Sequence, residues 1–375
     1  MSTFFPVHHT GDSSLTDSAI VYCEANFGSL DGKTANGLVR HSEKYRVLSV
    51  IDSAKAGLDT GFVLDGKPND IPICIDLTDA IRQAGCVPDH FILGMAPSSG
   101  MLSVHERGIV LEAMNLGMNI VNGLHEFLND DAEFTAAAEM NNVSIRDVRR
   151  PGSSKDLRLF NGGINQVKCP RIAVLGTDCA IGKRTTATVI VQALKDAGLS
   201  AILIGTGQTG LIQGARYGIA MDAIPSQFCA GELEATIIEA FEAEQPDVIV
   251  IEGQGALSHP AFSTTSFILR GSCPQAVILQ HAPARFFRCD FEHMVMPSVA
   301  SEINLIQTFS NTQVIGLTLN HEHMSDAQIG ASICAYESEL GIPVTDALTR
   351  SPAHLCDMIF AAFPALEEKR LVAVK

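Results

Sequence analysis

A glycine-rich segment that ends in a lysine is the part of this sequence that most clearly indicates chemistry. Residues 171–188 read RIAVLGTDCAIGKRTTAT, in which an apolar run ends at Leu175 and a helical pattern begins at Lys183. Glycines such as Gly176 and Gly182 let successive backbone N–H groups converge on an anion, and a helix N-terminus adds its dipole. The lysine ammonium group adds a mobile positive charge. The segment therefore predicts a phosphate-binding loop, or P-loop.

Two departures from the usual P-loop pattern bear on what the loop holds. Five residues separate Gly176 from Gly182, where four are usual, and Arg184 stands where Ser or Thr would ligate magnesium, with Thr185 one position later. The longer loop and its Gly-Thr-Asp opening resemble the P-loop of dethiobiotin synthetase. Arg184 adds positive charge but weakens the case for metal-bound ATP. The residues expected to contact phosphate are Gly176, Thr177, Asp178, Ala180, Gly182, Lys183, Arg184 and Thr185.

Three side chains are candidates for acid–base chemistry. Residues 246–255 read PDVIVIEGQG, so a buried strand ends in Glu252 before a glycine-rich turn. In P-loop proteins a carboxylate at this place faces the phosphate site, where it binds magnesium, orients water or acts as a general base; the alternative is that it caps the next turn. His259 follows closely and titrates near neutral pH, although a lone loop histidine is often structural. With Asp178 of the loop, these residues form the predicted catalytic set.

Gly205–Gly210 reads GTGQTG and formally fits a dinucleotide-binding pattern, but its context argues against that function. It follows the second strand of its half, Gly214 and Gly218 interrupt the helix that should come next, and no strand-ending acid lies at the required distance. We expect a flexible loop near the ligand, with an ordinary surface loop as the alternative. The donors in and beyond this loop that can meet a carboxylate are Gln208, Thr209, Gln213 and Arg216.

A second anion site in the first half of the chain is one hypothesis that the sequence offers, with an ordinary helix start as the alternative. Gly32-Lys33-Thr34-Ala35 precedes a short helix that ends near Arg40, without an upstream glycine at P-loop spacing. This pattern favours a helix-start anion site with Lys33, Thr34 and Arg40. His125, just past a predicted strand end, is a separate candidate functional residue.

Two other clusters of polar residues each have two interpretations. Arg285 and Arg288 flank two phenylalanines and form either an anion clamp or a solvated edge. His321 and His323 alternate after a strand, a pattern that can bind metal, but no third ligand at a helical offset accompanies them. We expect a capping or subunit-contact role for these histidines and predict no metal site.

The elements that must position these residues alternate between strands and helices in both halves. This order predicts an α/β protein with mostly parallel sheets that are covered on both faces. The first half should form strands over 19–23, 45–51, 71–75, 91–95 and 118–121, with helices clearest over 103–116 and 132–140. The second half should form strands over 171–175, 201–204, 247–251, 275–279 and 313–319, and helices over 183–197, 231–244 and 326–340. Turn formers dominate residues 148–170, so we expect a Rossmann-like domain over 1–150 and a P-loop domain, similar to dethiobiotin synthetase, over 151–375.

Composition sets limits on partners and location. The chain has 375 residues, 46% of them hydrophobic, and a formal net charge of −16. An acidic surface repels phosphate backbones, so we expect no nucleic-acid partner. No apolar run is long enough to cross a membrane, no signal peptide opens the chain, and ten cysteines occur without CxxC pairs. These features predict a cytoplasmic protein with reduced thiols, and an enzyme of this size is often a homo-oligomer.

Several motifs together resemble one widespread bacterial family of formerly unknown function. They are GTDCAIGKRTTA, TGQTG, AGELE and IEGQG in the second half, with GKTANGLVR, VIDSAKAG and NGLHEFL in the first. The resemblance covers most of the chain, from about Ile20 to Ala361. Members of the family include the D-glutamate N-acetyltransferases (DgcN type). The resemblance implies acetyl transfer from acetyl-CoA to the amine of D-glutamate in D-amino-acid catabolism, beside an enolase-superfamily enzyme that processes the N-acetyl product.

The residues are compatible with this implied activity. Coenzyme A carries a pyrophosphate and a ribose phosphate, which a P-loop can hold without hydrolysis, and Arg184 then supplies charge in place of magnesium. A carboxylate or histidine can take the proton of the attacking amine, and loop amides can stabilise the tetrahedral intermediate. If the amine attacks the thioester directly, Cys179 is only a packing residue. The side chains expected to bind the substrate are Arg216, Gln208, Thr209, Lys33 and Arg40. Of these, the two arginines are expected to pair with the substrate carboxylates.

Two other function classes stay open at this point. By analogy with dethiobiotin synthetase, an ATP- and magnesium-dependent kinase or amide ligase for a small carboxylate substrate would keep Lys183, Thr185 and Glu252 in magnesium–nucleotide roles. A non-catalytic nucleotide-binding regulator is the third class. Thiol release from acetyl-CoA without metal would support acetyl transfer, whereas ADP release that requires D-glutamate would support the ligase.

Overall fold

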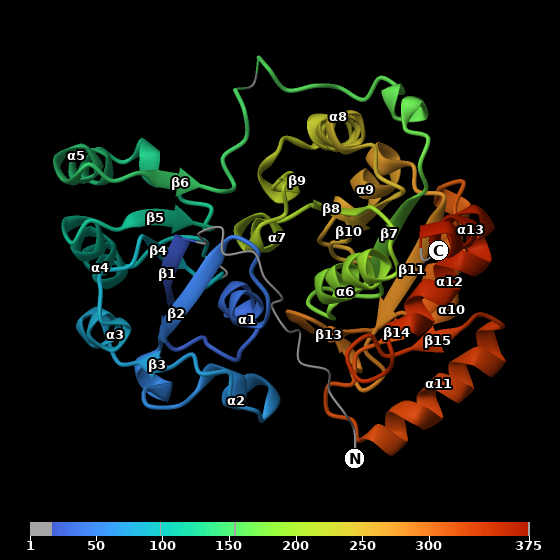
Figure 1. Cartoon of the computed structure of the whole chain (residues 1–375), viewed down its shortest axis with the longest axis horizontal. Coiled ribbons are helices and arrows are strands. Elements are labelled where there is room, and N and C mark those ends of the chain that lie inside the picture. Colours follow the sequence, from blue (N-terminus) through green and yellow to red (C-terminus); the bar gives the residue numbers. More distant parts are fainter. Residues whose placement is uncertain (1–16, 98, 154, 374–375) are drawn as a thin grey trace. The chain divides into compact units, whose positions relative to one another are not determined.

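The chain folds into two compact units, each built around a parallel β-sheet (Figure 1). The computed structural model describes residues 17–97, 99–153 and 155–373. Of the described residues, one unit comprises 17–151 together with Gly207–Ala215, and the other comprises those in 152–206 and 216–373. The short segment Gly207–Ala215 therefore packs with the N-terminal unit, although its neighbours in sequence belong to the other one.

A six-stranded parallel sheet forms the centre of the N-terminal unit. Its strands are β1 (Asp17–Tyr22), β2 (Tyr45–Ile51), β3 (Ile73–Cys74), β4 (His90–Leu93), β5 (Asn119–Asn122) and β6 (Ile145–Asp147). Their spatial order is β3-β2-β1-β4-β5-β6, in which the direction of winding reverses between β1 and β4. This order is that of a Rossmann fold, in which ligands bind beyond the carboxyl ends of the strands near the reversal.

Helices cover both faces of this sheet. They are α1 (Lys33–Arg40), α2 (Thr60–Asp65), α3 (Leu77–Ala84), α4 (Val104–Asn115), α5 (Ala132–Asn141) and α7 (Gln208–Gln213). Side chains fix several starts, as when Ser103 and Glu106 form a reciprocal capping box at α4. The core on one face includes Phe27, Leu38 and also Ile212 of α7, which explains why α7 belongs to this unit.

A seven-stranded parallel sheet forms the centre of the C-terminal unit. Its strands are β7 (Arg171–Gly176), β8 (Ala201–Gly205), β9 (Tyr217–Gly218), β10 (Val248–Glu252), β11 (Ala276–His281), β14 (Gln313–Leu319) and β15 (Val344–Thr345), in the order β15-β14-β11-β7-β10-β8-β9. A separate hairpin joins β12 (Phe287–Arg288) to β13 (Phe291–Val295). Strand β7 lies between β10 and β11, so the loop that follows it starts at the middle of the sheet.

Helices also cover both faces of the second sheet. They are α6 (Lys183–Asp196), α8 (Ser226–Glu244), α9 (Thr264–Ser272), α10 (Val299–Phe309), α11 (Asp326–Leu340), α12 (Ala353–Ala362) and α13 (Pro364–Ala373). One core cluster joins Ile190 of α6 and Ile359 of α12 to the sheet, and another joins Leu233 of α8 and Ile306 of α10 to its other face. Because both faces are covered, β7 and β10 are buried along their whole length.

The predicted fold class, an α/β protein with two parallel sheets, is confirmed. The expected core strands occur within a few residues of their predicted bounds. Sequence reasoning missed the short strands β6, β9 and β15, the β12–β13 hairpin, and helices α9, α10, α12 and α13. Within the described ranges, no helix combines the length and apolar character that crossing a bilayer requires.

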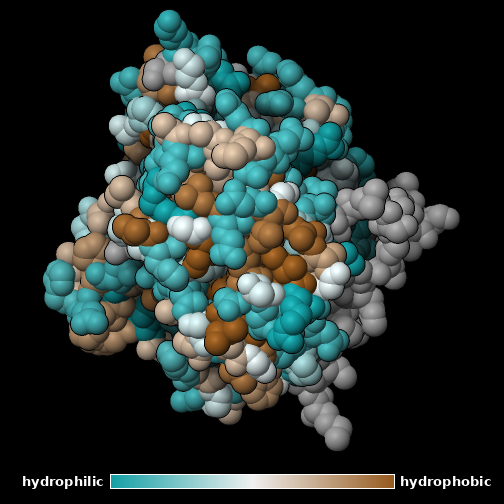
Figure 2. Space-filling model, turned by 90° about the vertical axis from the view of Figure 1, so that its left-hand side faces the viewer, coloured by the Kyte–Doolittle hydropathy of each residue, from teal (hydrophilic) through white to brown (hydrophobic). Residues whose placement is uncertain are grey.

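The N-terminal unit exposes several large apolar side chains. Val104 is 89% exposed and Met140 is 79% exposed. Others in this unit are Ile75, Val87, Met101 and Leu116. Figure 2 views the molecule from the side on which α3, α4 and α5 are drawn in Figure 1, and it shows apolar surface gathered between hydrophilic areas.

Candidate phosphate-binding site

The segment between β7 and α6 is an irregular loop, as a P-loop requires. The helix begins only at Lys183, and Gly182 before it has φ +100°, a conformation that favours glycine. Gly176 has a different role, because a Cβ there would lie 2.7 Å from Ile181 Cδ1 and 3.1 Å from the carbonyl oxygen of Gln280. The two glycines therefore let the loop close tightly on itself and turn into the helix.

Arg285 clamps this loop. Its Nη1 donates to Asp178 Oδ2 at 3.0 Å and to the carbonyl oxygen of Cys179 at 2.8 Å, and its Nη2 donates to the carbonyl oxygen of Ala180 at 3.4 Å. The same guanidinium group forms two bonds to the carboxylate of Glu322, at 2.8 and 3.0 Å. Its side chain is only 14% exposed. The solvated-edge interpretation of Arg285 is therefore wrong, and its charge is already shared by two carboxylates.

Other side chains bind the remaining carbonyl groups of the loop. Arg288, which is also buried, donates to the carbonyl oxygen of Thr177 at 3.3 Å, and Asn320 donates to that of Ile181 at 3.2 Å. With the contacts of Arg285 and the lysine described below, every carbonyl from 177 to 181 accepts a hydrogen bond from a side chain. The carbonyl dipoles are thereby held away from any anion that the loop takes.

The amide groups of the loop are arranged differently. Among the described residues, no acceptor pairs with the backbone N–H of Ile181, Gly182 or Lys183. By contrast, the N–H of Thr177 donates to Gln280 at 3.1 Å, and that of Thr186 donates to Gly182 at 2.9 Å. An anion-binding loop needs backbone N–H groups that are available at a helix N-terminus and carbonyl groups that already accept hydrogen bonds from other partners. This loop has both.

Lys183 is buried against this loop. Its Nζ donates to the carbonyl oxygen of Asp178 at 2.5 Å. Burial lowers the pKa of Lys183, while the ionised forms of the neighbouring groups Cys179, Asp178 and Glu252 act in the opposite direction. A phosphate at the loop would favour the charged ammonium group, since a nearby anion offsets the loss of hydration.

Glu252 lies at the end of β10, beside the loop. It pairs with Val174 of β7 in the sheet register and is 6% exposed. Its Oε2 accepts a hydrogen bond from the N–H of Thr206 at 3.1 Å, which joins it to the end of the neighbouring strand β8. Its charge acts on Lys183. The strand-ending acid and the loop lysine, predicted from separate motifs, thus lie in one site.

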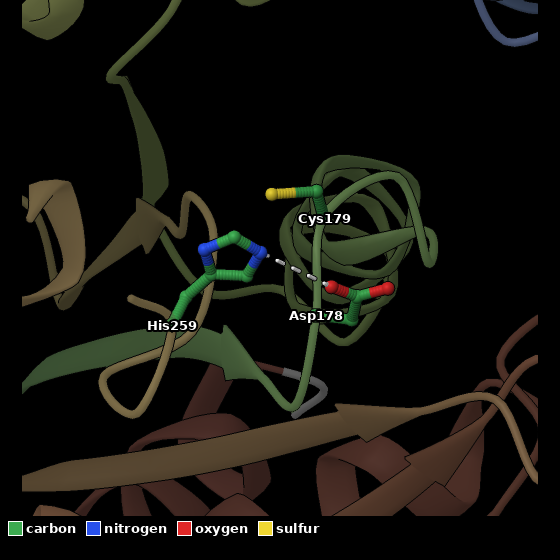
Figure 3. A group of neighbouring side chains, drawn as sticks. All are labelled: Asp178, Cys179 and His259. Carbon is green, nitrogen blue, oxygen red and sulfur yellow. Dashed lines mark ion pairs between the residues drawn. The ribbon is translucent and has the colours of Figure 1, made fainter. Parts of the chain in front are cut away.

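Asp178, Cys179 and His259 converge beside the loop (Figure 3). One oxygen, sulfur or nitrogen atom from each lies within 4.8 Å of the other two. The side chains of Asp178 and His259 are fully buried, and His259 Nε2 lies 3.8 Å from Asp178 Oδ1. Within the part of the chain that the structure describes, neither of these two atoms has a hydrogen-bond partner.

The protonation of His259 decides what this group can do. The N–H of Ala261 donates to His259 Nδ1 at 3.2 Å, so the neutral ring carries its proton on Nε2, which points toward Asp178. A metal ion would need the lone pair of Nε2, which this tautomer does not offer. Burial and the charge of Arg288 also lower the pKa of His259, which keeps the ring neutral. The geometry therefore favours a buried aspartate–histidine pair.

Three threonines and Arg184 lie near Lys183 in the sequence of the P-loop and the first turn of α6. The Thr177 hydroxyl pairs with His281 Nδ1 at 2.8 Å, so the fold uses this hydroxyl, and Thr186 Oγ1 donates to Gln280 Oε1 at 2.6 Å. Arg184 and Thr185 occupy the second and third positions of α6 and are partly exposed. Arg184 thus stands at the helix position where a magnesium-binding P-loop has its hydroxyl.

The two arginines predicted to bind substrate, Arg40 and Arg216, each form an ion pair with a carboxylate within their own unit. Arg40 forms an ion pair with Asp65 at 2.6 Å, and both side chains are largely exposed. Arg216 pairs with Glu244 and is 72% exposed. Both guanidinium groups therefore already have carboxylate partners at the surface.

Gln208 and Thr209 lie on α7, where a flexible loop was expected. That expectation is wrong, because the segment forms a short buried helix in the N-terminal unit. Thr209 Oγ1 pairs with Thr34 Oγ1 at 2.9 Å, and Gln213 Nε2 donates to the carbonyl oxygen of His41 at 2.7 Å. The absence of a long helix after GTGQTG, which argued against dinucleotide binding, is confirmed.

Several residues of these sites were missed or left undecided by sequence reasoning. Asn320, which follows β14, and Gln280 of β11 contact the P-loop region, and buried Arg149 lies in the N-terminal unit. Their positions directly at or after strand ends were the signal available, since such positions meet at the ligand-binding edge of a parallel sheet. Of the alternating histidines, His321 pairs with buried Asp346 at 2.7 Å.

Comparison with family models matches both halves of the chain. Residues 158–356 match the model described as "Domain of unknown function (DUF1611_C) P-loop domain", and residues 53–151 match the model described as "Domain of unknown function (DUF1611_N) Rossmann-like domain". A solved crystal structure of a DUF1611 family protein from Anabaena variabilis is similar, with a TM-score of 0.85 and 28% sequence identity. The similarity covers 92% of this chain and 99% of that one.

Two curated relatives carry the name D-glutamate N-acetyltransferase. The protein from a Pseudoalteromonas species is 34% identical over 266 residues, which are 69% of this chain and 77% of the relative. The protein from Tritonibacter scottomollicae is 28% identical over 277 residues, which are 72% of this chain and 80% of the relative. Both matches span most of the relatives' length.

Proposed function

The chain belongs to the DUF1611 family, and from this premise we propose that it is a D-glutamate N-acetyltransferase that takes the acetyl group from acetyl-CoA. The names of two relatives support the substrate and the reaction. The observation in this chain that carries the proposal is the P-loop, whose amides at Ile181, Gly182 and Lys183 have no acceptor among the described residues. Such a loop suits the pyrophosphate or ribose phosphate of the coenzyme.

The presence of Arg184 favours acetyl transfer over an ATP-dependent reaction. A magnesium-binding loop needs a hydroxyl at this helix position, and here a guanidinium stands there instead. Positive charge from Arg184 and Lys183 can neutralise phosphates without a metal. The coenzyme phosphates are not cleaved in acetyl transfer, so no magnesium-activated leaving group is required.

Glu252 is the better candidate for the general base. In the reaction the substrate amine loses a proton, its nitrogen attacks the thioester carbon, and the carbon–sulfur bond breaks to release the coenzyme thiol. His259 is poorly suited to accept that proton, because its Nδ1 already accepts from Ala261 and its Nε2 carries the proton that faces Asp178. Glu252 lies beside Lys183 at the carboxyl edge of the sheet, where ligands bind.

The test is a direct assay of the purified full chain. Acetyl-CoA and D-glutamate are incubated with a metal chelator, free thiol is followed with a thiol reagent, and N-acetylglutamate is identified by mass spectrometry. We expect thiol and product in equal amounts, with and without chelator, and much less with L-glutamate. Formation of ADP from ATP and magnesium that depends on D-glutamate, without thiol release, would overturn the proposal in favour of a ligase.

A further inference from the structure

We propose that Gln280, near the end of β11, donates a hydrogen bond from its side-chain Nε2 to the diphosphate group of the ligand that the P-loop holds. That this diphosphate belongs to acetyl-CoA rests on the proposed function, whereas the donor and the kind of oxygen it binds do not. All elements concerned, β7, α6, β11 and β14, belong to the C-terminal unit.

The backbone of Gln280 is fixed beside the P-loop. Strand β11 pairs with β7, and Gln280 lies opposite Gly176, the last residue of β7. Its carbonyl oxygen accepts a hydrogen bond from the N–H of Thr177, the first residue of the loop, at 3.1 Å. A Cβ at Gly176 would lie 3.1 Å from the same oxygen, so the two strand ends are in close contact. The position of Gln280 next to the loop therefore does not depend on its side chain.

Two threonine hydroxyl groups fix the orientation of the Gln280 side-chain amide. Thr186 Oγ1, in the first turn of α6, donates to Gln280 Oε1 at 2.6 Å, and Thr318 Oγ1 of β14 donates to the same oxygen. None of these three residues is more than 2% exposed. Because the amide oxygen faces both hydroxyl groups, the amide nitrogen with its two N–H donors faces away from them.

The amide nitrogen of Gln280 faces the turn that opens α6. A Cβ at Gly182 would have Gln280 Nε2 and Asn320 Nδ2 as its nearest neighbours, at 3.9 and 4.0 Å. Asn320 Nδ2 donates to the carbonyl oxygen of Ile181, whereas Gln280 Nε2 has no acceptor among the residues that the structure describes. This nitrogen is also not one of the fully enclosed polar atoms that lack a partner. A ligand oxygen can therefore reach it.

A buried donor without an acceptor at this place indicates an anionic ligand. Such a donor costs free energy unless a ligand supplies the acceptor that water would otherwise provide. The backbone N–H groups of Ile181, Gly182 and Lys183, which also lack acceptors among the described residues, lie at the same turn. One group with several oxygens, such as a diphosphate, can accept from all of these donors together. Gln280 is neutral, so it adds a directed hydrogen bond to the charge that Lys183 supplies.

Calorimetric titration of the full chain, with a metal chelator present, tests the donor. The ligands are acetyl-CoA, dephospho-coenzyme A, which lacks the ribose phosphate, and inorganic pyrophosphate. Gln280→Glu keeps the acceptor for both threonines but replaces the amide donor with an anionic oxygen. We expect all three ligands to bind about 30-fold more weakly to this variant. Gln313→Glu, the same change at an exposed position of β14, is the matched control and should bind them like the wild type.

Variants of Thr318 test whether the orientation of the amide matters. Thr318→Val removes one of the two hydroxyl groups that hold Gln280 Oε1, so we expect the three ligands to bind about 5-fold more weakly. Thr318→Ser keeps the hydroxyl group and should bind them like the wild type. Thermal melting shows which variants are folded, and this pair decides the matter if Gln280→Glu does not fold. An equal loss of affinity in Thr318→Val and Thr318→Ser would contradict the role of the hydroxyl group.

The outcomes separate the role of Gln280 from the proposed function. If folded Gln280→Glu binds the ligands like the wild type, or if the wild type binds none of them, the inference is overturned. A loss confined to acetyl-CoA, with dephospho-coenzyme A unaffected, would place Gln280 at the ribose phosphate and overturn the diphosphate assignment. If the binding of dephospho-coenzyme A and pyrophosphate depends on Gln280 but the wild type acetylates no D-glutamate, the donor stands and the proposed function fails.

Discussion

Lys183 is buried, opens α6 and donates from its Nζ to the carbonyl oxygen of Asp178. We predict that Lys183→Ala weakens acetyl-CoA binding by about 30-fold, because one charged hydrogen-bond donor to phosphate is lost. Lys195→Ala, on the exposed side of the last turn of the same helix, is the matched control. Equilibrium titration of both variants measures the effect. Equal coenzyme affinity in Lys183→Ala and Lys195→Ala would contradict the placement of phosphate at the loop.

Glu252 is expected to act on turnover more than on binding. Glu252→Gln keeps an acceptor for the N–H of Thr206 but removes the basic carboxylate. We therefore expect kcat to fall by about 100-fold, the usual scale of general-base catalysis, while acetyl-CoA affinity changes less than about 3-fold. Steady-state kinetics with D-glutamate checks this, with Glu242→Gln on α8 as the control. A variant with normal kcat would assign the proton transfer to another group.

The residues that sequence reasoning found are those that local motifs mark. Gly176, Gly182 and Lys183 follow from the spacing of one loop, and Glu252 follows from the end of one strand. Arg285 was identified as a candidate, but its role could not be predicted from the sequence. Its hydrogen-bond partners lie more than thirty positions away along the chain. The ion pairs of Arg40 with Asp65 and of Arg216 with Glu244 could not be predicted, because they depend on packing that no motif records.

At the scale of elements, the turn into α6 depends on the conformation of one glycine. A side chain at Gly182 would meet no atom closer than 3.9 Å, so the cost of Gly182→Ala comes from φ +100° alone. We predict a loss of about 1–2 kcal/mol in the free energy of unfolding, with weaker coenzyme binding. Gly108→Ala, in the middle of α4 with open space around it, should instead stabilise by about 0.5–1 kcal/mol. Urea unfolding of the pair measures both, and a stable Gly182→Ala variant would show that the turn is not strained.

His281, at the end of β11, couples stability to pH. Burial, with a smaller contribution from Arg285, lowers the pKa of this imidazole to about 4, below its ordinary value of 6.5. Between these pH values the unfolded chain binds a proton that the folded chain does not, so stability is lost as the pH falls from about 6.5 to 4. The full loss is about 3 kcal/mol.

Urea unfolding at a series of pH values tests this coupling. The free energy of unfolding should fall more steeply with acidification in the wild type than in His281→Gln, with the difference corresponding to one proton. Parallel pH profiles for the two proteins would show that His281 does not carry the effect.

Elements with clear periodicity could be predicted, and those without it could not. The central strands are continuous buried apolar runs, which explains why β7 and β10 were found. Strands β9 and β15 have two residues each, too few for any pattern. Helix α7 was mistaken for a flexible loop, because its glycines argue against a helix and its burial comes from the N-terminal unit.

At the scale of the whole molecule, each unit is an α/β domain with its own parallel sheet, and in the proposed enzyme the P-loop unit would hold the coenzyme. The division into two α/β halves was readable from the alternation of strands and helices. The assignment of Gly207–Ala215 to the N-terminal unit was not, because it depends on contacts between distant segments such as Thr34 with Thr209.

The exposed apolar side chains of the N-terminal unit lead to a prediction about assembly. We expect the chain to be a homo-oligomer, because apolar surface of this kind is commonly covered by a subunit contact (Figure 2). Val104→Glu, at a side chain that is 89% exposed, should then shift the species toward monomer in light scattering after gel filtration. Asn304→Glu, an equal charge change at an exposed position of α10, is the control. A wild-type monomer would contradict this prediction.

The most direct test of the account is a crystal structure of the chain with acetyl-CoA bound. We predict that phosphate oxygens of the coenzyme lie within hydrogen-bonding distance of the backbone N–H groups of Ile181, Gly182 and Lys183, with the Lys183 ammonium group turned from the Asp178 carbonyl toward them. Acetyl-CoA bound with its phosphates away from this loop would contradict the central claim.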